Sequence, residues 1–164
     1  MIRSIKKIIV FAMVALNIPV NASAFETSKH IQMDGCTSAA CVDERVKSCV
    51  AAAEAEGDAY LSSRWCSNVA FEQADELLNA FYQDAMKKTI SIALEMSVTP
   101  MNGHEDLLRQ SQRAWLEVRD TTCELNVLYG FIGSGADTVI AQFKARMTMQ
   151  RIGDLNTEIG RYLN

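Results

Sequence analysis

Histidine is scarce in this chain of 164 residues, and its five cysteines include no Cys-x-x-Cys pair. His30 and His104 are the only two histidines. Zinc sites and thioredoxin-type redox sites need Cys and His at short spacings, so neither kind of site is predicted. Ser-His-Asp catalysis would have to use one of these histidines, and no nucleophile-elbow motif accompanies them. We therefore expect no catalytic residue, no metal and no cofactor.

The chain also lacks the alternation of apolar and polar residues that predicts β-strands. Apolar residues recur instead at three- and four-residue steps, in segments separated by turn and breaker residues. These breakers are Gly57-Asp58, then Pro100, Asn102 and Gly103, then the loop 130–135. The sequence predicts an all-α fold, a small antiparallel bundle of about four helices supported by disulfides. The expected helices are 38–56, a second that begins at Ala59 or Cys66 and ends at Met96, 104–129 and 136–162.

Apart from the helix 104–129, which is treated below, each of these helices has a clear apolar face. The first is expected to bury Val42, Val46, Cys49, Val50 and Ala53. For the second, the face is Ala70, Ala74, Leu77, Leu78, Phe81, Ala85, Ile92 and Met96. For the last, it is Ile140, Phe143, Met147, Ile152, Leu155 and Ile159.

The helix 104–129 has the strongest pattern and is the segment around which we expect the fold to be organised. Its predicted buried stripe is Leu107, Ser111, Ala114, Val118, Thr122, Leu125 and Tyr129. At about 100° per residue, one flank of that stripe carries Gln112, Trp115, Arg119 and Cys123. The residues that determine specificity for a partner are expected on this flank, at the border between core and solvent.

The first 24 residues form a predicted signal peptide. Arg3, Lys6 and Lys7 precede a short apolar run, and Ala22-Ser23-Ala24 is a small-residue cleavage site. The run is short for a transmembrane helix, and no cysteine sits at the cleavage point, so no stable membrane anchor is expected after cleavage. We expect a mature protein beginning at Phe25, periplasmic or secreted, with a mobile arm at 25–37 and a single helical domain at 38–164.

The mature chain is acidic. It contains 13 basic and 20 acidic residues, a net charge of −7, because the signal peptide holds three bases and no acid. Such a charge disfavours nucleic-acid binding and favours a basic protein partner.

Two other patterns have ordinary explanations. The loop 130–135 has three glycines, but it lacks the phosphate-loop ending and follows no strand, so we interpret it as a turn between helices. Glu117, Asp120 and Glu124 lie near one another on the helix 104–129, where a solvated outer face explains them better than a catalytic carboxylate pair.

Trp115 and Arg119 each allow two interpretations. Trp115 can pack at the core edge or act as a binding anchor. Arg119 can tie its helix to a neighbour through a carboxylate, or join Trp115 in contacting a partner. Gln112 and Asp120 beside them complete the set of candidate partner-binding residues.

The run from Leu108 to Cys123 resembles the signature of the exported bacterial family called lysozyme-inhibitor LprI-like. The matching pattern is Leu108-Arg109-x-x-Gln112-Arg113-Ala114-Trp115-Leu116-x-x-Arg119-Asp120-x-x-Cys123. Other elements agree in order, namely Cys66, Ala74-Asp75, Leu78-Asn79-x-x-Tyr82, Gly133-Ser134 and Thr148-x-x-Arg151-x-x-x-Leu155. The resemblance covers about residues 66–163. It implies an all-helical, disulfide-supported envelope protein, with lysozyme inhibition as the activity of the namesake.

The cysteines depart from the family pattern at one position. The family usually has a cysteine five residues before its closing Thr, where this chain has Phe143, so Cys123 is expected to be a free thiol. If the last two helices fold antiparallel about residue 133, position 123 faces position 143. The same argument about Gly57-Asp58 places Cys49 opposite Cys66, and Cys36 with Cys41 is the expected second pair.

The resulting hypothesis is a non-enzymatic envelope protein that binds and inhibits a protein partner, with a basic, lysozyme-type cell-wall hydrolase as the candidate that the resemblance implies. The alternative is a structural or chaperone-like periplasmic protein without a hydrolase target. On the binding hypothesis, Arg119→Ala should weaken inhibition without unfolding the domain. An exposed apolar surface around Trp115 would favour binding, and a fully buried Trp115 a structural role.

Overall fold

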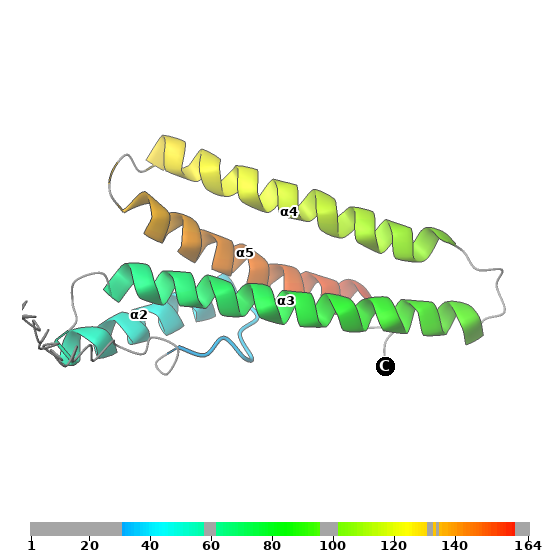
Figure 1. Cartoon of the computed structure of the whole chain (residues 1–164), viewed down its shortest axis with the longest axis horizontal. Helices are drawn as coiled ribbons and strands as arrows, with labels where there is room; N and C mark the ends of the chain where they lie inside the picture. The colour runs from blue at the N-terminus through cyan, green and yellow to red at the C-terminus, as the bar shows by residue number, and fades with distance from the viewer. Residues whose placement is uncertain (1–30, 58–61, 96–101, 131–132, 134, 160–164) are drawn as a thin grey trace, which may run out of the picture.

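The computed structural model describes residues 31–57, 62–95, 102–130, 133 and 135–159. This part of the chain contains four helices and no strand: α2 (Ala39–Ala55), α3 (Ser62–Glu95), α4 (Asn102–Gly130) and α5 (Ala136–Ile159) (Figure 1). The predicted all-α bundle is therefore confirmed, with boundaries close to those expected. The predicted signal peptide and residues 160–162 of the expected last helix lie outside the described residues.

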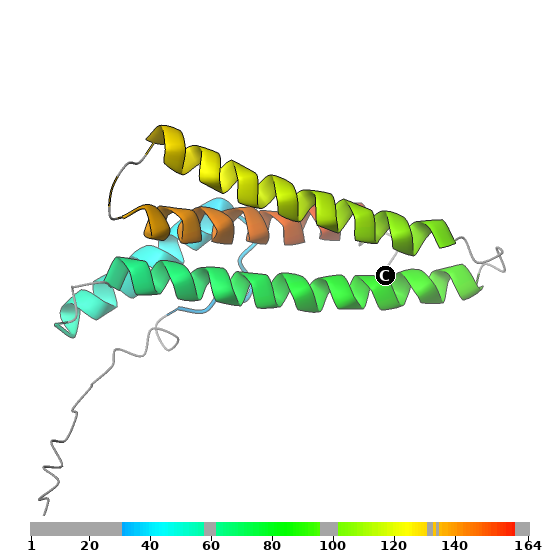
Figure 2. The same cartoon turned by 45° about the horizontal axis from the view of Figure 1, so that its top comes forward.

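Helices α3 and α5 form the centre of the bundle. Each of them packs against the other three helices, whereas the described residues of α2 and α4 make no contact with each other. Figures 1 and 2 show α3, α4 and α5 running side by side, with each helix antiparallel to the one before it. Helix α4 lies at the edge of the bundle, against α5 and, more lightly, against α3.

Small residues allow α3 and α5 to approach closely. Ala70 and Ala74 of α3 and Ala141 and Ala145 of α5 are all buried, each pair separated by one helical turn. The predicted apolar face of α5 is consequently shifted. Leu155 is buried as expected, but the other five predicted positions are only half-buried.

Two groups of apolar side chains form the core. The first surrounds α2 and includes Val42, Val46, Cys49, Ala53, Ala70, Ala74, Ala145 and Met149. The second lies further along α3 and includes Leu78, Ala85, Leu108 and Leu155, with Trp115 packed against it. Because α5 contributes to both groups, the bundle has one continuous interior rather than two separate halves.

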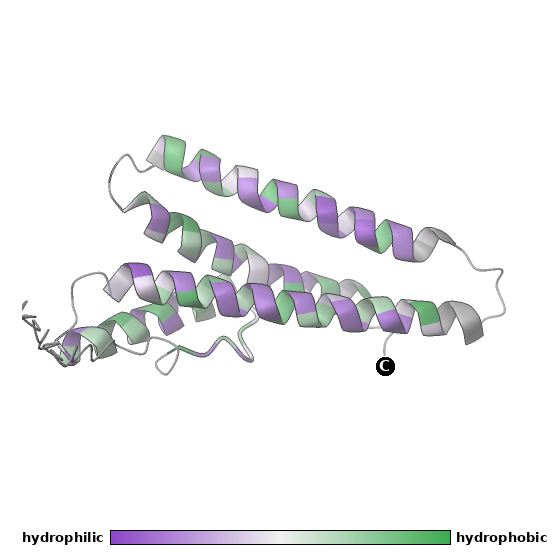
Figure 3. Cartoon of the chain, viewed as in Figure 1, coloured by the Kyte–Doolittle hydropathy of each residue, from purple (hydrophilic) through white to green (hydrophobic). Residues whose placement is uncertain are grey.

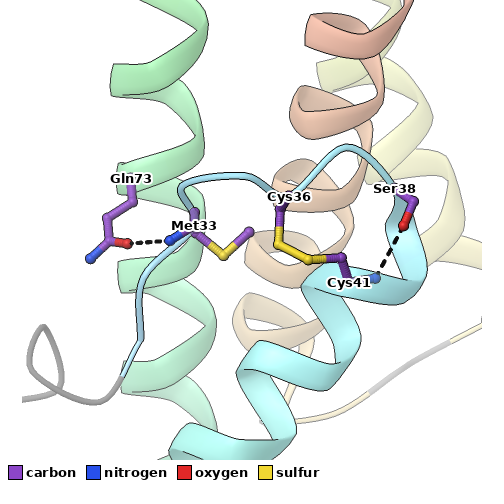
Figure 4. The surroundings of a disulfide bond; sticks show 5 residues. All are labelled: Met33, Cys36, Ser38, Cys41 and Gln73. Atoms are coloured by element: carbon purple, nitrogen blue, oxygen red, sulfur yellow. Dashed lines mark hydrogen bonds between the residues drawn. A yellow bond between two sulfur atoms is a disulfide. The ribbon is translucent and has the colours of Figure 1, made fainter.

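The segment 31–37 is packed against the bundle, which corrects the expectation of a mobile arm for these residues. Ile31 and Met33 are buried, and the Gln73 side chain of α3 binds the backbone of both residues. Its amide nitrogen donates to the Ile31 carbonyl at 3.1 Å, and its carbonyl oxygen accepts from the Met33 N–H at 3.0 Å. Figure 4 shows the contact with Met33. Residues 25–30 of the expected arm lie outside the described residues.

Two disulfides connect α2 to the segment before it and to α3. Cys36 pairs with Cys41 (Cα–Cα 5.6 Å) and Cys49 with Cys66 (Cα–Cα 5.9 Å), which is the pairing that the sequence predicted. Ser38 caps α2 by accepting a hydrogen bond from the Cys41 N–H at 3.3 Å (Figure 4). The turn after α2 has Gly57 at φ +85°, a conformation that glycine adopts without a steric penalty.

Candidate functional site

The buried face of α4 is the flank that carries the signature residues, not the apolar stripe that the sequence predicted to be buried. Leu108, Gln112, Arg119 and Cys123 are buried, and Trp115 is half-buried. Of the predicted stripe, only Thr122 is half-buried, and the other six residues are exposed. The helix is therefore rotated by roughly a third of a turn from the expected orientation.

Arg119 connects three helices. Its Nη1 donates to Oδ1 of Asp75 on α3 at 2.9 Å and to Oγ1 of Thr148 on α5 at 3.3 Å. Its Nε donates to Oδ1 of Asp120, the next residue on α4, at 3.0 Å. With only 6% of the residue exposed, the guanidinium charge is compensated by two carboxylates, as a buried cation requires.

Aromatic rings surround the same guanidinium. Its Cζ lies 5.3 Å from the ring centroids of both Trp115 and Phe71, within the range of cation–π attraction. Arg151 of α5 approaches Trp115 as well, with Cζ 5.8 Å from the ring centroid. Trp115 thus packs against Arg119 of α4 and Arg151 of α5, which accounts for its half-buried position between the core and solvent.

Gln112 belongs to a second polar contact between α4 and α5. Its Oε1 accepts from Nε of Arg151 at 3.4 Å, and Oγ of Ser111 accepts from Nη2 of Arg151 at 2.9 Å. Gln112 and Arg151 are both buried, so each supplies a hydrogen-bonding partner that the other needs away from water.

Asp120 lies at the open rim of this arrangement, with 44% of its side chain exposed. Lys144 of α5 reaches it at 3.0 Å from Oδ1, and the Nζ of Lys144 also lies 5.7 Å from the Phe71 ring centroid. Partial burial raises the pKa of Asp120, but the hydrogen bonds from Arg119 and Lys144 outweigh it and lower the pKa below its ordinary value.

Cys123 is a buried free thiol, as the sequence predicted. Burial raises its pKa, and the nearby carboxylates of Asp120 and Glu124 add to that increase, against the opposing charges of Lys144 and Arg119. A thiol with a raised pKa is a poor nucleophile at neutral pH. Its surroundings therefore point to packing rather than to chemistry.

The four candidate partner-binding residues are thus close together, but they differ in accessibility. Gln112 and Arg119 are buried between helices, whereas Trp115 and Asp120 retain exposed edges. Their partners Phe71, Asp75, Lys144, Thr148 and Arg151 were not predicted to be contacts. Asp75, Thr148 and Arg151 stand in segments that carry the family resemblance, which was the one available signal.

The outer side of α4 carries the exposed apolar residues. The exposed large apolar side chains among the described residues are Leu107, Val118, Leu125, Leu128 and Tyr129 on α4, and Ile90 on α3. Figure 3 shows apolar residues recurring between polar ones along α4. Within the described residues, no helix has the combined length and hydropathy required to cross a membrane.

Comparison with known proteins identifies the family. Residues 49–155 match the family model described as lysozyme inhibitor LprI, a match over more than half of the chain. No curated protein and no solved structure matches the chain. The matched range includes both partners of the Cys49–Cys66 disulfide and every residue of the Arg119 contacts described above. The chain therefore belongs to the lysozyme inhibitor LprI family.

Proposed function

We propose that the mature chain is exported to the periplasm or secreted, where it binds and inhibits a lysozyme-type cell-wall hydrolase. The observation that carries this proposal is the family match over residues 49–155. Two disulfides support it, because disulfides persist in oxidising compartments outside the cytoplasm. The proposed role is non-enzymatic and needs no cofactor.

The charge of the mature chain supports a basic partner. Residues 25–164 have a net charge of −7, so a basic muramidase is attracted before contact. Electrostatic attraction increases the association rate and makes it dependent on salt, but it does not by itself give specificity. Specificity requires side chains that are buried on binding, most often aromatic residues and arginine.

We propose that the accessible part of the signature region supplies those side chains. Trp115 and Asp120 have exposed edges and can touch a partner directly. Arg119 and Gln112 are buried, and in this proposal they act as positioning residues that hold Trp115 and Asp120. A partner's cation would then compete with Lys144 for the Asp120 carboxylate.

The experiment measures clearance of a peptidoglycan suspension by a basic lysozyme-type muramidase, with increasing amounts of the disulfide-bonded mature chain. We expect inhibition at low salt that weakens as salt increases. Asp120→Asn should weaken inhibition several-fold. Glu44→Gln is the matched control, because it removes the same charge from the exposed face of α2, which does not touch α4.

Thermal melts of both variants separate a loss of binding from a loss of folding. A folded wild-type chain that leaves the muramidase fully active at low salt and large excess overturns the inhibitor proposal. The alternative is then a structural or chaperone-like role without a hydrolase target. The observation that favours the alternative is the use of Arg119 and Gln112 in contacts between helices.

A further inference from the structure

We infer that a groove between segment 31–37 and α3 binds a lysine or arginine side chain of a basic protein partner. The groove has a volume of about 480 Å³. We call it the acidic groove, and the lining residues that define it are Met33, Asp34, Gln73, Glu76, Leu77 and Ala80. The binding chemistry of the groove does not depend on the proposed hydrolase. Only the identification of a muramidase as its partner rests on the proposed function.

Segment 31–37 holds Asp34 in a fixed position on one side of the acidic groove. The Cys36 N–H donates to the Met33 carbonyl at 3.1 Å and closes a turn in which Gly35 has φ +76°. Gln73 binds the backbone at the start of this turn, and a disulfide attaches its last residue to α2 (Figure 4). Because the backbone is already ordered, a ligand of Asp34 does not have to order it on binding.

Helix α3 supplies the other side of the groove and a second carboxylate. Gln73, Glu76 and Ala80 follow one another at steps of three and four residues, so they share one side of the helix. At about 100° per residue, this side lies roughly 150° around α3 from Asp75, which binds Arg119. The acidic groove is therefore separate from the signature region.

The two carboxylates of the groove have no cation of their own. Asp34 and Glu76 are both exposed, and among the described residues neither forms an ion pair or a side-chain hydrogen bond. Segment 31–37 contains one acidic residue and no basic one, and residues 65–86 of α3 contain four acidic residues and no basic one. The groove therefore has a negative potential that attracts cations.

The apolar part of the lining favours a long cationic side chain over a metal ion. Met33 is buried and Leu77 is half-buried, so the deeper part of the groove is apolar. Lysine and arginine have an apolar stem that can cover Leu77 and Ala80 while the charged head reaches the carboxylates. A divalent cation needs more oxygen ligands than two carboxylates supply, and the described residues contain no cluster of three or more metal-ligating side chains.

A basic protein is the occupant that presents such side chains. The mature chain has a net charge of −7 and attracts a basic protein as a whole. The acidic groove then provides a local contact in which a charge and an apolar stem are recognised together.

The test follows the backbone amide NMR signals of the mature, disulfide-bonded chain while a trilysine peptide is added. The ionic strength is about 0.15 M, where the screening length of about 8 Å suppresses distant attraction. We expect saturable shifts at Asp34, Gly35, Glu76 and Leu77. Asp34→Asn combined with Glu76→Gln should raise the dissociation constant of the peptide more than about tenfold.

The matched control is Glu44→Gln combined with Glu54→Gln. It removes the same charge from exposed positions of α2 that do not line the groove, and it should leave the dissociation constant unchanged. Thermal melts check that both double variants remain folded. Absence of shifts in the groove overturns the inference. An equal loss of affinity in the control variant also overturns it, because the peptide would then bind to negative charge in general.

The muramidase assay, repeated with both double variants, identifies the partner. We expect the groove variant to lose inhibition several-fold and the control variant to retain it. Equal inhibition by both variants overturns the muramidase as the partner at the groove. A wild-type chain that binds the peptide in the groove but leaves the muramidase fully active overturns the proposed function and not the binding chemistry of the groove.

Discussion

Nη1 of Arg119 lies 2.9 Å from Oδ1 of Asp75, although the two residues are 44 positions apart in the chain. The same guanidinium binds Asp120 and Thr148, so one side chain of α4 is hydrogen-bonded to both α3 and α5. This relationship gives the family signature in residues 108–123 a physical explanation: its arginine, Arg119, fixes α4 at the edge of the bundle onto α3 and α5.

Arg119→Ala should therefore destabilise the domain, in contrast to the expectation from sequence alone that the variant remains folded. The substitution removes hydrogen bonds to two carboxylates and two cation–π contacts. We expect the free energy of unfolding to fall by about 2–4 kcal/mol, measured by urea denaturation. Arg113→Ala is the control on the same helix. It should change the free energy of unfolding by less than about 0.5 kcal/mol, because Arg113 is exposed. Equal effects of the two substitutions would contradict a structural role for Arg119.

The two disulfides should contribute unequally to stability. Cys49–Cys66 joins residues 17 positions apart, and Cys36–Cys41 joins residues five apart. On the chain-entropy account, which is model-dependent, the longer loop stabilises by about 3 kcal/mol and the shorter by about 2 kcal/mol. Melts of the paired Cys→Ser variants check this order. Non-reducing peptide mapping checks the connectivity, and a bridge between Cys123 and any other cysteine would show it to be wrong.

Cys123 should be almost unreactive in the folded chain. A thiol reagent at pH 8 should label it slowly until denaturant is added, and Cys123→Ala should abolish the signal, because the other four cysteines are paired. The pKa of Cys123 is raised by burial in the folded state. As pH rises, the thiol of Cys123 therefore loses its proton in the unfolded chain before it does so in the folded chain. The free energy of unfolding should fall as pH rises above the ordinary thiol pKa of about 8.5. Fast labelling of a fully folded sample would contradict the buried placement.

The sequence predicts most of the fold but misplaces the buried faces of α4 and α5. Helix positions follow from periodicity and breakers, and the Cys49–Cys66 pair follows from the turn at Gly57. The rotation of α4 could not be predicted, because hydropathy favours burial of Val118 over Arg119. The partners that make Arg119 burial possible, Asp75 and Thr148, are distant in sequence.

The packing of residues 31–37 escaped prediction for a similar reason. Ile31 and Met33 show no periodicity, and the side chain that binds their backbone is Gln73, 40 or more positions away. A segment without periodicity is easily interpreted as a free arm until the distant partner of its backbone groups is known.

The central position of α5 has a consequence for the order in which the molecule can form. Helix α5 packs against all three helices that precede it and contributes to both core groups, so those helices cannot complete their common interior until residues 136–159 have been synthesised. Until then, the interior of the nascent precursor is incomplete. For the export that we propose, such delay is useful, because a chain that cannot yet fold can still be threaded through a narrow channel.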